Sequence, residues 1–308
     1  MQISTAYIFD RASTQMSNAT NALSKSQAQI AQGKQILNAS DAPDQAAAIN
    51  RLQSTIGRHD SYSKALDSVQ GRLDLESTTL SSASDVLVRI KELTVQANNG
   101  TQGTISLAAI AAEMKGLRDQ LLSLGNSRDT SGNYIFSGSK VSTPAFQADK
   151  EGLVSYRGDQ TLTHVAIGDE RKLALNRPGS AAFVRVVRTD ANTGKAEGVG
   201  FFQAIDDLMA AVKDNNKAGM QQGLGEMDAL HNGVVLAQAD VGTSMKVVEQ
   251  QGAVLDDTKL TLKTALSNLQ DLDMSTAVTQ MQKQMVSLEA AQASFAKISQ
   301  LSLFKYLG

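Results

Sequence analysis

Apolar residues recur at three- and four-residue intervals near both ends of this chain. In the first run the larger positions are Phe9, Met16, Leu23, Ile30 and Leu37, with alanine, serine or glycine between them. Such spacing places residues along one stripe of a helix. The last run repeats the pattern with Val278, Met281, Met285, Leu288, Ala291, Phe295 and Ile298. We therefore predict an amphipathic helix at each end and expect the two helices to pair.

Charged side chains are scarce in both terminal runs. The ionisable residues from Met1 to Leu37 are Asp10, Arg11, Lys25 and Lys34, and those from Val278 to Gly308 are Lys283, Glu289, Lys297 and Lys305. Solvated helix faces usually carry more charge, and short isolated helices are marginal in water. We predict that these ends become ordered only in an assembly, where neighbours cover their outer faces. The predicted assembly interface consists of Phe9, Met16, Leu23, Ile30, Leu37, Met281, Met285, Leu288, Phe295, Ile298, Leu303, Phe304 and Leu307.

Heptad spacing also dominates the regions next to the two ends. It runs from Leu66 to Ala97 and, after Asn98-Asn99-Gly100, from Leu107 to Leu124, which predicts a helix, a break and a second helix. A longer run covers 224–269, and a shorter helix at 202–212 precedes it. The segment NASDAPD at 38–44 indicates a helix start, with Ser40 or Asp41 as N-cap and Pro43 in the first turn.

The middle of the chain has a different pattern. Seven of the thirteen aromatic residues lie between Tyr134 and Phe202, which indicates a core of its own. Short runs at 133–136, 153–156, 164–167 and 172–175 are separated by Gly, Asp and Pro signals, which favours a small β domain.

The predicted fold is therefore mainly α. The N- and C-terminal regions form a long antiparallel helical hairpin, or coiled-coil rod, with a small β domain inserted at its tip. We expect terminal coiled-coil segments at 1–42 and 266–308, a helical rod at 43–132 and 201–265, and the β domain at 133–200.

Composition excludes several classes of partner. The net charge of -2, from 29 basic and 31 acidic residues, gives no electrostatic footprint for nucleic acid or an anionic membrane surface. The absence of cysteine excludes disulfides and thiolate chemistry. No run approaches the roughly 18–20 apolar residues that span a bilayer. The opening MQISTAYIFDR lacks the basic and apolar regions of a cleaved secretory signal, so we expect any export to use another route.

Motifs for catalysis are missing as well. His59, His164 and His231 stand alone in sequence, without the paired spacing of a zinc site, and packing or polar contacts explain them better. Asp206-Asp207 and Asp256-Asp257 lie in amphipathic helices where adjacent residues face different directions, unlike a facing acid–base pair. Gly223 and Gly225 lack the rest of a dinucleotide fingerprint. We predict no enzymatic activity, no metal and no cofactor.

Four segments carry a resemblance to a known family. They are the opening MQISTAYIFDRASTQM, the segment QIAQGKQILNASDAPDQAAA, the turn GNYIFSGS and the closing AAQASFAKISQLSLFKYLG. Together they resemble the bacterial flagellin superfamily over roughly 1–140 and 200–308. Ile3-Ser4-Thr5 and the ending at 301–307 look more like the branch that joins hook to filament than like filament flagellins. Asp41-Ala42-Pro43 departs from the family, which more often has two acidic residues before this proline.

The resemblance implies a structural role in the bacterial flagellum, at the junction between hook and filament. It implies a ring of this chain inserted between hook-associated protein 1 and flagellin, export through the flagellar type III apparatus, and a dedicated cytoplasmic export chaperone. A filament flagellin is the main alternative. The heptads alone also allow a cytoplasmic coiled-coil adaptor, although the nearly uncharged ends argue against one.

Overall fold

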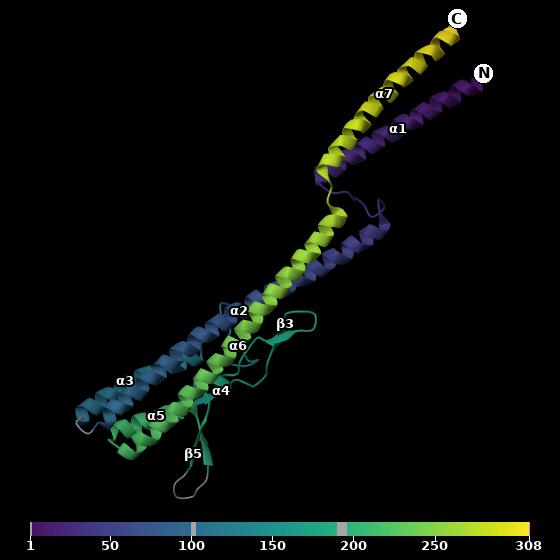
Figure 1. Cartoon of the computed structure of the whole chain (residues 1–308). Helices are drawn as coiled ribbons and strands as arrows, with labels where there is room; N and C mark the ends of the chain where they lie inside the picture. The colour runs from purple at the N-terminus through teal and green to yellow at the C-terminus, as the bar shows by residue number, and fades with distance from the viewer. Residues whose placement is uncertain (1, 100–102, 190–195, 308) are drawn as a thin grey trace. The chain divides into compact units, whose positions relative to one another are not determined.

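The computed structural model describes residues 2–99, 103–189 and 196–307. In the first helix, side chains are described for residue 7 and from residue 9 onward, and in the last helix they are described up to residue 297. The chain divides into two compact units (Figure 1). We call the unit made of residues 1–59 and 256–308 the terminal unit, and the unit made of residues 60–255 the central unit. Two long helices, α2 (Pro43–Asn98) and α6 (Lys217–Gln270), contribute to both units.

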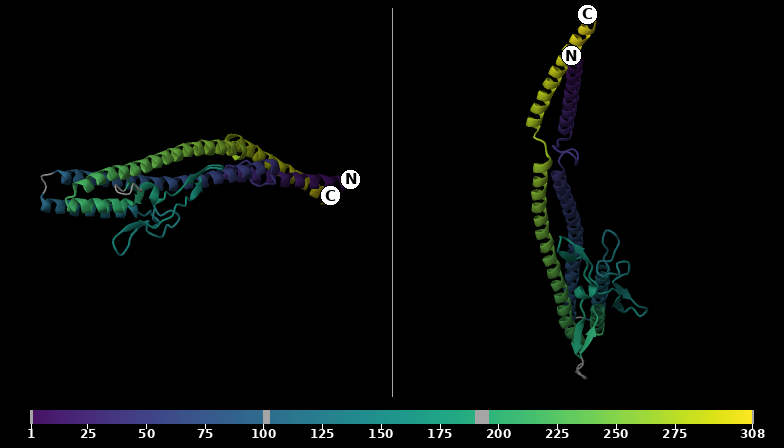
Figure 2. Two further views of the ribbon diagram at one scale, coloured as in Figure 1. Left: turned by 90° about the horizontal axis from the view of Figure 1, so that it is seen from below. Right: turned by 90° about the vertical axis from the view of Figure 1, so that its right-hand side faces the viewer.

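In the terminal unit, α1 (Gln2–Gln32) and α7 (Met274–Leu307) lie side by side (Figures 1 and 2). They run antiparallel, because the first turns of α1 lie beside the late turns of α7. At their other ends the backbone of Leu272 donates to the carbonyl of Gly33 at 3.0 Å. The prediction that the two terminal helices pair is confirmed.

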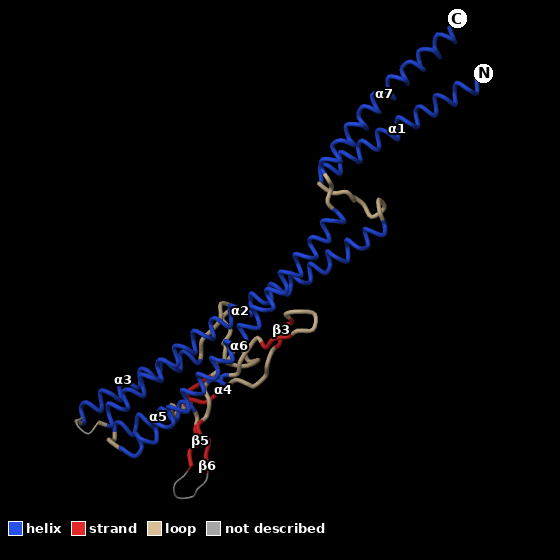
Figure 3. Tube along the Cα trace, viewed as in Figure 1, coloured by secondary structure: helices blue, strands red, loops and turns tan. Residues whose placement is uncertain are grey.

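Both long helical paths are interrupted at the same level of this unit. The N–H of Gln35 donates to the carbonyl of Gln270 at 2.8 Å, beside the bond from Leu272 to Gly33. Figure 3 shows the loop between α1 and α2 next to the short link between α6 and α7. We call the contact formed by Gly33, Gln35, Gln270 and Leu272 the paired break.

Glycine ends α1 earlier than predicted. Gly33 adopts a left-handed backbone with φ of +64°, which glycine accepts without steric cost. The N–H of Lys34 donates to Gln29 and the N–H of Gly33 donates to Ile30, the two bonds of a Schellman helix end. The predicted stripe is therefore wrong beyond Gln32, and Leu37 lies in a loop. Spacing alone treated Gly33 as a small seam residue and missed its role as a stop.

The predicted cap of α2 is also wrong, although Pro43 does occupy the first helical residue. Instead of capping the helix, the Asp41 carboxylate accepts the N–H groups of Leu37 at 3.3 Å and Asn38 at 3.0 Å. It thus closes the loop that precedes α2. Ala42 stands in the capping position, and its carbonyl accepts the N–H of Ala46.

The central unit packs α3 (Thr104–Gly125) and α5 (Phe201–Lys213) against α2 and α6. The predicted sequence of helix, break and helix is confirmed. The Oγ atom of Ser84 in α2 lies 3.0 Å from Nε2 of His231 in α6. The histidine therefore makes an interhelical polar contact, as expected. The largest completely buried side chains of these helices are Leu80, Leu87, Ile90, Leu93, Leu107, Met114, Leu121, Phe202 and Ile205.

Six short strands lie between α3 and α5 in the described residues, and they form three separate antiparallel pairs. Three of the four predicted strand runs are confirmed. The strands are β1 (Phe146–Ala148) with β2 (Val154–Tyr156), β3 (His164–Ala166) with β4 (Lys172–Ala174), and β5 (Val186–Thr189) with β6 (Ala196–Val199).

The predicted strand at 133–136 is wrong. Residues there belong to a turn, because the Asp129 carboxylate accepts the N–H groups of Ser131 and Asn133, both at 2.9 Å. Gly132 supports the turn with φ of +83°. The apolar side chains of Ile135 and Phe136 are still fully buried, so burial rather than strand formation explains this run.

The aromatic residues of the middle region pack together as predicted, but they do not form a core of their own. The ring centroid of Phe146 lies 5.1 Å from that of Phe183 and 5.3 Å from that of Phe202 in α5. All three rings belong to one buried cluster that continues among the helices. The strand region therefore packs along α2, α5 and α6.

The end of α5 provides a test of backbone strain. Asn215 has φ of +53°, and its N–H donates to Val212 while Asn216 donates to Ala211, as at a Schellman helix end. A side chain without a polar group costs roughly 1–2 kcal/mol in this conformation. We expect Asn215→Ala to lower the free energy of unfolding by about 1 kcal/mol, whereas Asn215→Gly stays within about 0.5 kcal/mol of the wild type. Urea denaturation of the three proteins measures both effects, and equal losses in the two variants would contradict this explanation.

Candidate assembly interface

The helix pair brings most of the predicted interface residues together. The rings of Phe9 and Phe295 are tilted by 46° to each other, with centroids 4.8 Å apart. Because the helices are antiparallel, seven residues forward on α1 correspond to seven residues back on α7. The resulting levels pair Met16 with Leu288, Leu23 with Met281, and Ile30 with Met274. We call this alignment the terminal seam.

Small residues occupy the levels between these large ones. On α1 they are Ala12, Ala19 and Ser26, and on α7 they include Ala277 and Ala291. Ser26 is 8% exposed. Cα atoms of the two helices approach within 8 Å, which such small contact residues permit. Large and small layers therefore alternate along the terminal seam.

Burial in the terminal unit is nevertheless incomplete. Ser26, Ile36 and Ile49 are its buried residues among the described side chains. The large seam residues Met16, Leu23, Ile30, Met281 and Leu288 are half-buried. The clustered buried core, by contrast, belongs entirely to the central unit. Among its described side chains, the terminal unit thus has no clustered core.

Several large apolar side chains of the helix pair keep much of their surface exposed, including two of the terminal seam, Phe9 and Met274. Tyr7 is 66% exposed, Val286 65%, Met274 48% and Phe9 45%. Burying such side chains contributes roughly 1.5–3 kcal/mol each, so covering these faces would stabilise the pair further. The outward faces therefore offer an apolar surface to a neighbour.

Some predicted interface residues lie away from the terminal seam. Met285 is 42% exposed, and Gln284 takes the half-buried position beside it. The Oε1 atom of Gln284 is buried without a hydrogen-bond partner among the described residues. Leu37 is half-buried in the loop after α1. The backbone of Ile298, Leu303, Phe304 and Leu307 lies in α7, but their side chains fall outside the described residues.

A salt bridge that sequence reasoning missed fixes the loop after α1. The Lys25 ammonium lies 2.6 Å from the Asp41 carboxylate. The Asp41 pKa is lowered, first by this hydrogen bond and then by the N–H of Asn38. The side chain of Gln29 also donates to the carbonyl of Gln35 at 2.6 Å. Asp41 in the segment NASDAPD was the sequence signal for this salt bridge, but the pattern assigned Asp41 to a helix cap.

A cap at the start of α7 holds the other side of the paired break. The Asp273 carboxylate accepts the N–H groups of Ser275 at 3.0 Å and Thr276 at 3.3 Å, and the Thr276 hydroxyl at 2.7 Å. These bonds satisfy donors that the first turn of a helix leaves free, and they lower the pKa of Asp273. Local hydrogen bonds thus determine where α7 begins.

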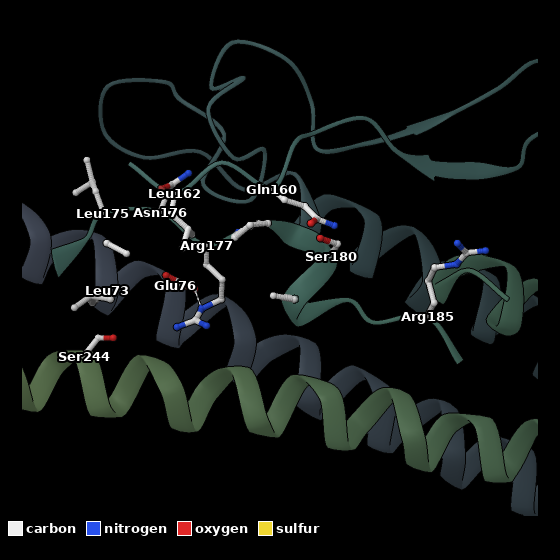
Figure 4. A pocket seen from close by; sticks show the side chains of 13 residues that line it. Leu73, Glu76, Gln160, Leu162, Leu175, Asn176, Arg177, Ser180, Arg185 and Ser244 are labelled. Atoms are coloured by element: carbon white, nitrogen blue, oxygen red, sulfur yellow. Dashed lines mark hydrogen bonds and ion pairs between the residues drawn. The ribbon is translucent and has the colours of Figure 1, made fainter. Parts of the chain in front are cut away.

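The central unit has a cavity of about 680 Å³ between its strand region and the long helices (Figure 4). Glu76 and Arg177 lie at its wall and form an ion pair, with Nε and Oε1 2.7 Å apart. Arg177 also approaches Asp240 at 3.3 Å. Burial raises the pKa of Glu76, although Arg177 acts in the opposite direction. This pair joins the strand region to α2 and α6.

The two adjacent carboxylates of α5 are engaged in structural contacts. Asp206 binds Arg118 at 3.0 Å, whereas Asp207 binds Arg188 at 2.8 Å, so the adjacent carboxylates have different partners. Within the described residues, no cluster of three or more His, Cys, Asp or Glu side chains is arranged to hold a metal ion. No described helix is long and apolar enough to cross a membrane.

Both ends of the chain match known helical regions of bacterial proteins. Residues 3–141 match the bacterial flagellin N-terminal helical region, and residues 224–307 match the bacterial flagellin C-terminal helical region. The chain is 26% identical to flagellar hook-associated protein 3 of Escherichia coli (strain K12), over 99% of both chains. It is 22% identical to flagellin of Bacillus subtilis (strain 168), over 92% of both chains. Its fold resembles flagellar hook-associated protein 3 from Legionella pneumophila, with a TM-score of 0.66 at 18% identity, over 72% of this chain and 98% of that one.

Proposed function

The chain belongs to the bacterial flagellin family, and from this premise we propose that it is a structural subunit of the flagellum that joins the hook to the filament. One observation carries the choice of a junction role. The match to hook-associated protein 3 extends over 99% of both chains, whereas the match to the Bacillus flagellin covers 92% and has lower identity.

The proposed mechanism depends on the incomplete burial of the terminal unit. We propose that neighbouring copies cover the outward faces of α1 and α7 and so complete the surfaces that the terminal seam leaves exposed. Binding only to the ordered state stabilises that state by mass action. The interface residues named from the sequence would then act through assembly, with residues 1–42 and 266–308 forming the inner tube.

The proposed partners are other copies of this chain in a ring, hook-associated protein 1 on one side and flagellin on the other. Before assembly, a cytoplasmic chaperone would hold the chain for export through the flagellar type III apparatus, without a cleaved signal peptide. In this function the chain acts as a structural component rather than an enzyme. Asp206, Asp207 and His231 support that view, because they contact Arg118, Arg188 and Ser84 respectively.

A filament flagellin is the second candidate, and the similarity to Bacillus flagellin favours it. The two functions differ in what the purified chain does alone. A filament flagellin should polymerise into long filaments by itself. A junction protein should instead add to hooks that carry hook-associated protein 1 and then allow flagellin to polymerise. Electron microscopy of both mixtures distinguishes them.

Native hydrogen exchange on the purified monomer tests the proposed mechanism. We expect amides in 7–32 and 274–297 to exchange at least about a hundredfold faster than those of the central unit, because local opening is cheapest where burial is least. Assembly should then slow exchange in both segments. Equal protection of the two units in the monomer would overturn assembly-coupled ordering, and would favour a self-contained helical adaptor.

A further inference from the structure

The described methionines range from fully buried to more than 40% exposed, and Met16, Met209, Met245 and Met281 are half-buried. Met114, Met220 and Met227 are fully buried in the central unit. In α7, by contrast, Met274 is 48% exposed and Met285 is 42% exposed. Eleven residues separate these two positions, which corresponds to a rotation of about 20° around a helix. Met274 and Met285 therefore lie on one face of α7, with Met274 at the last level of the terminal seam and Met285 beside the seam.

We propose that Met274 and Met285 are peroxide-sensitive modification sites, and that their conversion to methionine sulfoxide blocks assembly of the terminal unit. The first part concerns the chemistry of the chain itself. The second part rests on the proposed function, because it needs α7 to be covered by a neighbour.

The reaction is a two-electron oxygen transfer from hydrogen peroxide. The thioether sulfur attacks one peroxide oxygen, the O–O bond breaks, and a new S–O bond forms. The other oxygen leaves as hydroxide and takes up a proton from the attacked oxygen, so the second product is water. Sulfur is oxidised by two electrons and the peroxide is reduced by two. No other cofactor is required.

Two features of the chain direct the oxidant to these positions. The sequence contains no cysteine, so no thiolate competes for peroxide. The three fully buried methionines lie in a packed core that peroxide does not reach without opening of the fold. Met16 and Met281 are half-buried in the terminal seam and should react more slowly than the two exposed sites.

A sulfoxide at these sites changes the face that α7 presents. Methionine is flexible and apolar, and it adapts to irregular packing. Its sulfoxide carries a strong hydrogen-bond acceptor that prefers water, so covering it without a donor is unfavourable. Met285 follows Met281, which forms a layer with Leu23, by about one helical turn, and Met274 forms the next large level of the terminal seam with Ile30. Both sulfoxides would therefore disturb packing along the terminal seam.

Peptide mass spectrometry after brief treatment of the folded full-length chain with dilute hydrogen peroxide tests the sites. We expect Met274 and Met285 to oxidise at least tenfold faster than Met114, Met220 and Met227. Oxidation of Met16 or Met281 before these two, or equal rates at all methionines, would overturn the assignment of the sites.

A double variant, Met274→Leu with Met285→Leu, tests the consequence with nearly unchanged side-chain volume. After peroxide treatment, we expect the amount of wild-type chain that assembles onto hooks carrying hook-associated protein 1 to fall at least tenfold. The treated variant should assemble in the same amount as the untreated variant. Equal losses in both proteins would overturn the block. If the untreated wild type does not add to hooks, the proposed junction role fails and the block fails with it, whereas the peptide rates still decide the oxidation sites.

Discussion

Leu23→Asp is expected to abolish assembly of the chain while leaving the central unit folded. Leu23 is half-buried at the middle of the terminal seam, level with Met281. A carboxylate there has to stay hydrated, and hydration forces this layer apart. Burying it unpaired costs several kcal/mol, which corresponds to a loss of at least about a hundredfold in assembly yield.

Sedimentation of assembled material measures the loss, and circular dichroism monitors the fold. The fully buried core of the central unit contains no residue of α1, so its thermal transition should shift by less than about 2 °C. Gln27→Asp is the matched control, because it adds the same charge to the same helix at an exposed polar position. An equal loss of assembly in both variants would show that charge on α1 matters wherever it lies, and would remove the special role of the seam.

Arg177→Met is expected to lower the free energy of unfolding of the central unit by about 3–5 kcal/mol near neutral pH. The side chain of Glu76 is 5% exposed, and Arg177 is its ion-pair partner at 2.7 Å. Removal of the guanidinium leaves a buried carboxylate without this partner. Methionine keeps most of the aliphatic volume, so the loss reports mainly on charge.

The pH dependence of this variant has a definite sign. Burial already raises the pKa of Glu76 above its ordinary value of 4.5, and loss of Arg177 should raise it further. A carboxyl group whose pKa is higher in the folded state stabilises that state below its unfolded pKa and loses this contribution as the pH rises through the folded pKa. The deficit of the variant should therefore shrink as the pH falls from about 7 towards about 5.

Urea denaturation at several pH values measures this recovery. The double variant Arg177→Met with Glu76→Leu is the control, because it has no buried carboxyl group at this position. Replacing both members of a buried pair by apolar residues is often neutral, so the double variant should be more stable than Arg177→Met at neutral pH. A deficit that is independent of pH, or equal in the two proteins, would mean that lost packing rather than the unpaired charge causes it.

Periodicity predicted the helices well and their ends poorly. The three–four spacing correctly located α2, α3, α5 and α6, because burial of one stripe determines where a long helix packs. The end of α1 depends instead on the left-handed backbone of Gly33. The spacing of apolar residues carries no information about that backbone conformation. Asp41 likewise binds loop amides and Lys25, and these partners are known only once the chain turns back.

The candidate interface was predictable in part for the same reason. Phe9 and Phe295 are far apart in sequence, yet matching heptads indicated that their helices pair, and the rings do meet. Met285 fits almost the same spacing as Gln284, so spacing alone did not decide which of the two faces α1. The choice is made by the rotation of α7, which its Asp273 cap and its packing against α1 determine together.

The paired break makes the lengths of the two terminal helices depend on each other. Gly33 and Leu272 hold the helices together at one end, while Phe9 and Phe295 meet near the other. If seven residues were deleted from α1 alone, the late turns of α7 would have no partner, whereas a matched deletion would preserve every layer. In evolution, insertions and deletions in these two segments should therefore occur together and in steps of seven residues. Each such change would add or remove matching stretches at both ends of the gene.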